Sequence, residues 1–244
     1  MIYSSKQNTA IKEIASLKDK KYRNKLGLYV AEGIKMVNEA IKYGVKVKIV
    51  VATSEALEYI TKGDYKLMEV TKEVFSYVSD ENTPQGALAV IEIPVNNVVS
   101  PSGNALLLDG VSDPGNMGTI IRTAVAFGYN DIYLVGCVDP YSPKVVRASM
   151  SGIYFVNLYK TDVQTALNVI SGLDVIVADM GGENLDGYEN NNRHCIVVGN
   201  EANGVSDFVK QNATKIVGIP MLEKSESLNV AVASAIMMYK LKKL

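Results

Sequence analysis

The sequence predicts an α/β protein with two domains, the second of them built on a parallel β-sheet. Short strand-like runs in the second part are apolar throughout, as expected of strands buried on both faces of a sheet. Helical segments separate these runs, and this alternation is typical of parallel sheets. A stretch rich in Asn, Ser, Pro and Gly interrupts the pattern near residue 100 of the 244. We therefore expect domains at residues 1–95 and 105–244, joined by a linker at residues 96–104.

Short helices and strands alternate in the predicted N-terminal domain and indicate a small α/β sandwich. Helices are expected at residues 9–17, 34–43 and 74–78. Gly44 follows the second of them and suits a helix C-terminus. Strands are expected at residues 28–30, 48–52, 67–70 and 86–93. Residues 18–25 form a basic stretch between the first helix and the first strand.

The second domain has a more regular pattern. Strands are expected at residues 105–109, 132–135, 154–158, 175–178, 195–198 and 216–219. Helices are expected at residues 119–127, 143–151 and 163–170, the first of them ended by Gly128. A last helix begins near Asn229, where Ser225 or Ser227 could act as the N-cap. Because that helix is apolar almost all round, we expect it to be buried or to form an interface.

The composition excludes several classes of protein. The net charge is −1, so an RNA partner would need local basic patches, and lysines and arginines do cluster before residue 26. Two cysteines and one histidine argue against a disulfide framework, a zinc site and a Ser-His-Asp triad, and we expect no metal. Cys137 and Cys195 should pack as small apolar residues, and His194 should precede a strand at the surface. With no signal peptide and no membrane-spanning run, we expect a cytoplasmic protein without membrane contact.

Glycines and polar residues follow the expected strands of the second domain, where ligands of doubly wound sheets bind. One loop runs from Asp113 to Gly118 into a helix that carries Arg122, and its forked guanidinium suits phosphate recognition. Another loop begins with Gly199 and includes Glu201. A turn beside a solvated arginine and a strand-ending turn are the plain alternatives for these two loops. The fingerprints GxGxxG and GxxxxGK[ST] are absent after the strands, which disfavours a nicotinamide or ATP enzyme and leaves open an adenosine ligand without phosphates.

Three blocks of the second domain carry a common pattern. They are LLLDGVSDPGNMGTIIRTAVAFGYNDIYLV, IVVGNEANGVS and IPMLEKSESLNVAVASAI, at residues 106–135, 196–206 and 219–236. In order, spacing and residue types these blocks resemble the SpoU family of RNA ribose 2′-O-methyltransferases, within the knotted SPOUT superfamily. The intervening PKVVRASMSGIYFV, with Arg147, is also similar to that family.

This resemblance implies S-adenosylmethionine as the methyl donor. It also implies that the C-terminal helix threads back through a loop and forms a deep trefoil knot around the cofactor site. Gly199, Ile219 and Leu228 would contact the cofactor largely through backbone groups, with Met180, Gly181 and Met221 as walls.

The resemblance further implies in-line transfer of the sulfonium methyl group to a ribose 2′-oxygen, centred on Arg122. The family proposal makes this arginine the base, but its pKa above about 12 makes it a poor base at neutral pH. We therefore expect Arg122 to bind the target phosphate and orient the 2′-hydroxyl. Asn116 would orient Arg122 or the ribose, and Glu201 would fix the site electrostatically. Ser227 and Asn229 would hydrogen-bond the ribose, the phosphate or neighbouring loops.

The N-terminal part resembles the ribosomal-protein-like substrate-binding domain that often precedes this catalytic domain. Residues 26–41, LGLYVAEGIKMVNEAI, and residues 83–91, TPQGALAVI, carry that likeness. We expect RNA contacts at Lys20, Arg23 and Arg147. The architecture favours 23S ribosomal RNA as the substrate. A tRNA methyltransferase, a non-enzymatic RNA-binding protein and a different adenosine-dependent α/β enzyme are the alternatives. The resemblance also implies a homodimer, for which the apolar last helix is the expected interface.

Overall fold

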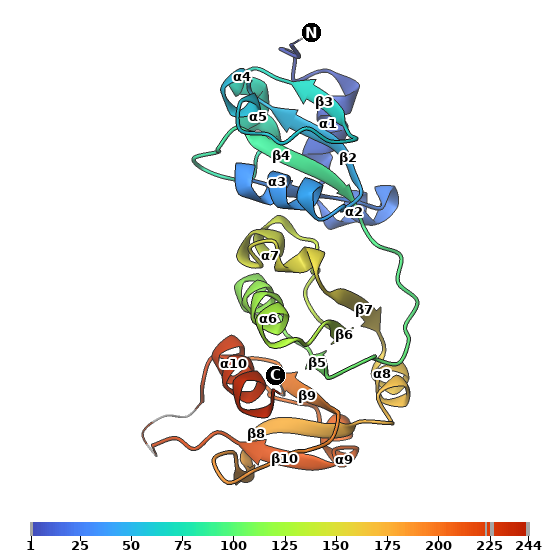
Figure 1. Cartoon of the computed structure of the whole chain (residues 1–244), viewed down its shortest axis with the longest axis vertical. Helices are drawn as coiled ribbons and strands as arrows, with labels where there is room; N and C mark the ends of the chain where they lie inside the picture. Colours follow the sequence, from blue (N-terminus) through green and yellow to red (C-terminus); the bar gives the residue numbers. More distant parts are fainter. Residues whose placement is uncertain (1, 223, 225–226, 243–244) are drawn as a thin grey trace. The chain divides into compact units, whose positions relative to one another are not determined.

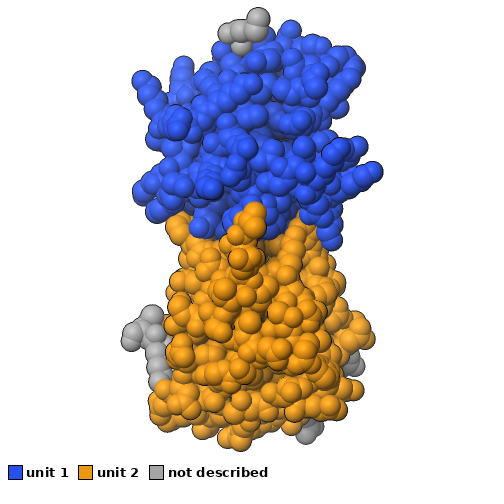
Figure 2. Space-filling view, turned by 90° about the vertical axis from the view of Figure 1, so that its right-hand side faces the viewer, with its two compact units in different colours: residues 1–94, 141–154 blue, residues 95–140, 155–244 orange. Residues whose placement is uncertain are grey.

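Two β-sheets organise the chain in the computed structural model, which describes residues 2–222, 224 and 227–242 (Figure 1). The chain divides into two compact units, coloured separately in Figure 2. The first unit joins Met1–Pro94 with Tyr141–Tyr154, and the second joins Val95–Pro140 with Phe155–Leu244. The predicted domain limits at residues 95 and 105 stay a prediction.

The first unit has a mixed four-stranded sheet in the order β1-β4-β2-β3. β4 is antiparallel to both of its neighbours, and β2 pairs in parallel with β3. Its elements up to residue 94 are α1 (Thr9–Ser16), α2 (Lys20–Leu26), β1 (Leu28–Glu32), α3 (Ile34–Lys42), β2 (Val47–Ala52), α4 (Ser54–Leu57), β3 (Lys66–Glu69), α5 (Lys72–Val78) and β4 (Ala87–Glu92). The basic stretch before β1 is helical, because Asp19 caps α2 and Gly27 ends it in the left-handed conformation.

The segment Tyr141–Tyr154 belongs to this unit through contacts of α7 (Pro143–Ala148) and η1 (Gly152–Tyr154). The Tyr154 hydroxyl donates to the carbonyl of Met36 at 3.2 Å, and the Ser151 hydroxyl lies 3.0 Å from the sulfur of Met36. The rings of Tyr29 and Tyr141 lie 5.0 Å apart. This segment is therefore anchored by hydrogen bonds and ring packing, although the sequence separates it from the rest of the unit.

The second unit has a parallel six-stranded sheet in the order β10-β8-β9-β5-β6-β7. Its elements are β5 (Ala105–Asp109), α6 (Pro114–Phe127), β6 (Asp131–Val135), β7 (Asn157–Thr161), α8 (Val163–Val169), β8 (Asp174–Asn184), β9 (His194–Gly199), α9 (Asp207–Gln211), β10 (Lys215–Gly218) and α10 (Val230–Leu241). The α/β class and the parallel sheet are as expected from the sequence. β5 and β9 are neighbours, with β6 and β7 to one side and β8 and β10 to the other. The strand order therefore reverses between β5 and β9, where doubly wound sheets bind ligands.

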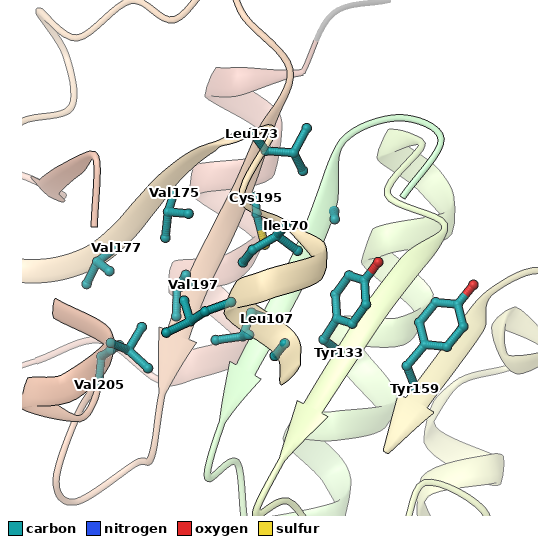
Figure 3. Packing of buried hydrophobic residues seen from close by; sticks show 14 residues of the cluster. Leu107, Tyr133, Tyr159, Ile170, Leu173, Val175, Val177, Cys195, Val197 and Val205 are labelled. Atoms are coloured by element: carbon teal, nitrogen blue, oxygen red, sulfur yellow. The ribbon is translucent and has the colours of Figure 1, made fainter. Parts of the chain in front are cut away.

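Apolar side chains between α8, α9 and one face of this sheet form a core, part of which Figure 3 shows. Leu107 of β5 and Val197 of β9 lie at its centre and are fully buried. The rings of Tyr133 and Tyr159 stack at 5.1 Å on neighbouring strands. The Tyr133 hydroxyl donates to the carbonyl of Val99 at 2.6 Å, which satisfies its polar atom at the edge of the core.

Several predicted boundaries were wrong for identifiable reasons. α6 begins at Pro114, earlier than residue 119, because the Asp113 side chain caps the amide of Asn116 and proline suits the first turn. β7 begins at Asn157 because Gly152–Tyr154 forms a 3-10 turn where a strand was expected. The N-cap of α10 is Asn229, whose Oδ1 accepts from the amides of Ala231 and Val232. Of the two serines predicted for that role, Ser225 lies outside the described residues, and Ser227 precedes the cap.

His194 was predicted at the surface and is instead fully buried at the start of β9. Its Nε2 lies 2.7 Å from the hydroxyl of Tyr129, and its Nδ1 lies 3.2 Å from the carbonyl of Asn192. Cys195 is buried in the core as expected, and Cys137 is half-buried. Burial raises the pKa of both thiols, that of Cys137 to about 11. Among the described residues no helix is long and apolar enough to cross a membrane.

Candidate functional site

A cavity of about 650 Å³ lies in the second unit beside the middle of β8, the ends of β9 and β10 and the start of α10. Loops that follow parallel strands meet at one edge of a sheet, so residues far apart in sequence come together there. The lining combines apolar side chains with exposed backbone and a few polar groups, as is usual for small-molecule sites. The volume is within the range of about 300 to 1,000 Å³ typical of such sites.

Glu201 is the hydrogen-bonding centre beside this cavity. Its Oε1 accepts from the amide of Asp113 at 3.0 Å and from Nδ2 of Asn116 at 2.9 Å. Its Oε2 accepts from the amide of Ser112 at 3.1 Å and from the hydroxyl of the same serine at 2.8 Å. The carboxylate therefore ties the loop after β9 to the loop after β5.

The protonation state of Glu201 follows from these bonds. Burial acts to raise its pKa, but hydrogen bonds from Asn116, Asp113 and Ser112 outweigh burial and lower the pKa from 4.5 to about 2. The side chain is thus a carboxylate throughout the physiological range. With both oxygens occupied by donors, it is better suited to fix the loops than to accept a proton.

Asn116 connects Glu201 to Asn229 at the start of α10. Asn229 uses its Oδ1 to accept from the amides of Ala231 at 2.9 Å and Val232 at 3.3 Å. Its Nδ2 is therefore the group that donates to Oδ1 of Asn116, at 2.9 Å. Asn116 in turn must donate from Nδ2 to Glu201, so one orientation of both amides satisfies every bond. This relay links three loops into one rigid support beside the cavity.

Gly199 ends β9 inside the cavity and permits the sharp turn that presents Glu201. A Cβ on Gly199 would lie 2.0 Å from the carbonyl carbon of Gly204. Asn200 and Gly204 exchange two backbone hydrogen bonds of 2.9 Å, and Asn200 Nδ2 donates to the carbonyl of Gly110 at 2.8 Å. Only glycine fits this close approach of two backbone segments.

Most of the predicted cofactor residues lie together. Met180, Gly199, Ile219, Met221 and Leu228 line the cavity, whereas Gly181, next to Met180 in β8, is not among its lining residues. Of the predicted catalytic residues, Glu201, Ser227 and Asn229 also line it. Asn116 reaches them through the relay.

Arg122 lies on α6, six residues after Asn116 in that helix, and its side chain is exposed. Within the part of the chain that the structure describes, its guanidinium makes no hydrogen bond or ion pair. The guanidinium is therefore free to bind an external anion. Arg122 is not among the residues that line the cavity, and no hydrogen bond of the described residues joins its side chain to Glu201, Asn116 or Asn229.

The three predicted RNA contacts lie in the first unit and differ in their exposure and in their protein partners. Lys20 is exposed at the start of α2. Arg23 is only 3% exposed, and its Nη1 donates to the carbonyls of Leu17 at 2.8 Å and Lys18 at 2.7 Å. This burial argues against Arg23 as an RNA contact, because its guanidinium closes the end of α1. Arg147 is half-exposed and forms ion pairs with the carboxylates of Asp80 and Glu81.

Sequence reasoning missed some residues of the site. Ser112 and Asp113 support Glu201, and Asn200 shapes the turn. Asp179 lines the cavity, and its hydrogen bond with Lys210, at 2.7 Å, lowers its pKa. Asn200 could have been found from its place directly after β9, whereas Ser112 carries no distinctive signal. Among the described residues no cluster of His, Cys, Asp and Glu is placed to hold a metal ion.

Fold and cavity together define an α/β protein with a small-molecule site beside β8, β9 and β10 of a parallel sheet. Comparison with known proteins identifies the family within this class. The family model for the SpoU rRNA methylase family matches residues 103–239, and that for the MRM3-like substrate binding domain matches residues 8–89. The chain belongs to the SpoU rRNA methylase family and is an RNA methyltransferase, which removes the non-enzymatic alternative.

Three relatives extend along nearly the whole chain. A Bacillus subtilis protein named 23S rRNA (guanosine(2553)-2′-O)-methyltransferase RlmP is 29% identical over 98% of both chains. The structure of a putative TrmH-family RNA methyltransferase from Porphyromonas gingivalis is 33% identical over 99% of both chains, with a TM-score of 0.88. An AdoMet-bound rRNA methyltransferase from Sinorhizobium meliloti is 27% identical over 98% of this chain and 96% of that one, with a TM-score of 0.88.

Proposed function

We propose that this enzyme transfers a methyl group from S-adenosylmethionine to a ribose 2′-hydroxyl of 23S ribosomal RNA. The observation that carries the proposal is the Glu201–Asn116–Asn229 relay beside a cavity lined by β8, β9, β10 and the start of α10, in a chain of the SpoU family. The Bacillus subtilis relative, named for 2′-O-methylation of 23S rRNA, matches both units. A solved structure on 2′-OH methylation of tRNA covers only 56% of this chain, and this difference favours ribosomal RNA over tRNA.

The cavity fits the cofactor. Ile219, Met221 and Leu228 offer apolar surface and backbone groups for an adenosine moiety, and the described residues that line the cavity include no lysine or arginine to bind a phosphate. Met180 and Gly181 would form a further wall, and Gly199 lets backbone approach closely. S-adenosylmethionine, when bound, supplies a methyl group attached to a positively charged sulfonium. Loss of the methyl group leaves this sulfur as a neutral thioether. The protein contributes by positioning the two reactants, which can lower the activation barrier of methyl transfer by several kcal/mol.

We assign the roles of the polar residues from their bonds. Glu201 holds the loops after β5 and β9 in place, and Asn116 and Asn229 extend that support to α10. Ser227, which lines the cavity, would hydrogen-bond the ribose or phosphate of the target nucleotide. Arg122, exposed and without a described protein partner, would bind the target phosphate and orient the attacking hydroxyl.

We also propose that the enzyme works as a homodimer through α10. Val232, Ile236 and Tyr239 are 48%, 36% and 64% exposed and recur at helical spacing, so one face of α10 presents apolar surface. A second copy of the chain is the expected cover, and a monomeric mass in solution at micromolar protein would contradict it. We further propose that the C-terminal helix forms a trefoil knot around the cofactor. The proposed place of action is the cytoplasm, where ribosomal RNA is modified.

The decisive experiment is methyl transfer in vitro with labelled S-adenosylmethionine. Two RNA substrates should be compared: 23S rRNA and bulk tRNA, both from cells lacking the gene. We expect label in 23S rRNA at a single ribose, mapped by resistance of the neighbouring linkage to alkaline cleavage. Label in tRNA alone, or in a base and not a ribose, would overturn the proposal.

A further inference from the structure

A second cavity, of about 350 Å³, opens within the first unit. It lies between the residues that follow β2, the start and middle of α5, and the turn that precedes β4. Every residue that lines it falls between Ile34 and Gly86, inside the stretch that matches the MRM3-like substrate binding domain. The function proposed above uses no residue of this cavity.

The floor of the cavity is apolar and closely packed. Phe75 and Ala56 are 1% and 3% exposed. Gly86 has a φ of +81°, and a Cβ there would lie 2.7 Å from the hydroxyl oxygen of Thr53. The amide of Thr53 donates to the carbonyl of Gly86 at 2.9 Å, which closes the wall. A flat apolar group could therefore rest on the floor without any rearrangement of the chain.

Tyr59 stands at the rim with 64% of its surface exposed. Its backbone is nevertheless held, because Asn38 donates from Nδ2 to the carbonyl of Tyr59 at 2.7 Å. The same asparagine accepts from the amide of Thr61 at 2.9 Å. Because hydrogen bonds already hold the backbone on both sides of this exposed ring, binding costs little further backbone conformational entropy. Such rings are the usual platforms on which proteins stack unpaired bases of RNA.

Gln85 gives the cavity an oriented hydrogen-bond donor. Its Oε1 accepts from the amide of Ile34 at 3.1 Å, which assigns the amide orientation. The two hydrogens of Nε2 have no acceptor among the described residues. They match the carbonyl and ring-nitrogen acceptors on the edge of a base.

The charges at the rim favour a base over a phosphate. Lys72 Nζ lies 2.7 Å from Oε1 of Glu55, and both side chains are largely exposed. Glu55 and Lys72 are the charged residues among those that line the cavity, so their pairing leaves no net positive charge there to attract a phosphate. A neutral, flat ligand with a polar edge fits this balance.

From these features we propose that this cavity receives an unpaired nucleobase of the substrate RNA, stacked on Tyr59 and hydrogen-bonded by Gln85. The inference rests on the proposed function for its ligand, RNA. It adds a site in the first unit that would select the substrate through a base exposed in a loop or bulge. The target nucleotide itself would be bound by the second unit.

The test measures the affinity of the full-length protein for 23S rRNA by filter binding, separately from methyl transfer. Tyr59→Ala should weaken binding by about 5- to 150-fold, the range for loss of one stacked base. Tyr59→Phe keeps the ring and should bind within about twofold of wild type. Tyr43→Ala removes another tyrosine of this unit, 51% exposed and outside the cavity, and should also stay within about twofold.

Ultraviolet crosslinking followed by mass spectrometry gives a second readout, in which we expect a nucleotide adduct on the peptide that carries Tyr59. Equal affinity of Tyr59→Ala and wild type, or equal losses in Tyr59→Ala and Tyr43→Ala, would overturn the inference. Wild-type protein that binds 23S rRNA through Tyr59 but does not methylate it would overturn the proposed function alone. Wild-type protein that does not bind 23S rRNA would overturn both.

Discussion

Replacing Glu201 by Gln keeps the shape of the side chain and removes its charge, so it tests how far the carboxylate supports the site. In the native protein each carboxylate oxygen accepts two hydrogen bonds. In Glu201→Gln one oxygen becomes an NH₂ group that faces donors. The hydroxyl of Ser112 can rotate to accept from it, but the amide of Ser112 cannot, and that amide loses its acceptor.

The magnitude follows from the lowered pKa. A fall from 4.5 to about 2 corresponds to about 3 kcal/mol of stabilisation at neutral pH. Glu201 is exposed, and solvent screening reduces this to about 1 to 2 kcal/mol. Because the folded-state pKa is depressed, the stabilisation is complete above pH 4.5 and is lost as the pH falls towards 2.

Urea unfolding of wild type and Glu201→Gln at pH 7 and at pH 3.5 measures this contribution, with Glu189→Gln as the control. Glu189 is also exposed and accepts no hydrogen bond within the described part of the chain. We expect Glu201→Gln to lower the free energy of unfolding at pH 7 by about 1 to 2 kcal/mol and by less at pH 3.5. A difference that stays the same at both pH values, or one that Glu189→Gln shares, would refute the reasoning.

Three further substitutions separate the roles of other residues. Arg122→Ala should reduce methyl transfer on the order of 100-fold or more through lost positioning, yet change unfolding by less than about 0.5 kcal/mol, since the guanidinium has no described partner. Retained turnover in this variant would remove Arg122 from the site. Gly199→Ala should cost about 1 to 3 kcal/mol of stability and abolish cofactor binding in calorimetry, because the new Cβ meets the backbone of Gly204; wild-type affinity would contradict this steric argument. Arg23→Ala should destabilise the protein by about 2 to 4 kcal/mol in denaturant unfolding, since a buried guanidinium closes the end of α1, while RNA affinity of the folded variant stays within about twofold. A variant of normal stability but weak RNA binding would restore the RNA contact first expected of Arg23.

The sequence predicted most of the fold because its patterns are local. Apolar runs located β5 and β9 within a residue, and Gly44 and Gly128 mark helix ends, both with positive φ. It failed where a tertiary bond decides the outcome. His194 is polar and was placed at the surface, but the hydroxyl of Tyr129, 65 residues earlier, makes its burial acceptable. Arg23 sits in a basic stretch that looks solvated, and only the fold shows that it turns inward.

The sequence predicted many residues of the candidate site, but not the hydrogen bonds between them. The rule that ligands bind after the strands of a parallel sheet predicts Glu201 and Asn229 as members of one site. Which group donates to which could not be read from the sequence, because the order of the relay depends on Asn229 acting as the cap of α10. Ser112 was missed since a serine after a strand carries no distinctive signal.

The protonated state of the two thiols also makes the enzyme a convenient object for chemical labelling. Thiol reagents attack the thiolate, and with both pKa values raised by burial Cys137 and Cys195 hold almost none of it at neutral pH. An engineered surface cysteine, for example in place of exposed Lys20, would then be the reactive thiol against an inert native background. A fluorophore attached there could follow RNA arriving at the first unit without any prior removal of native cysteines.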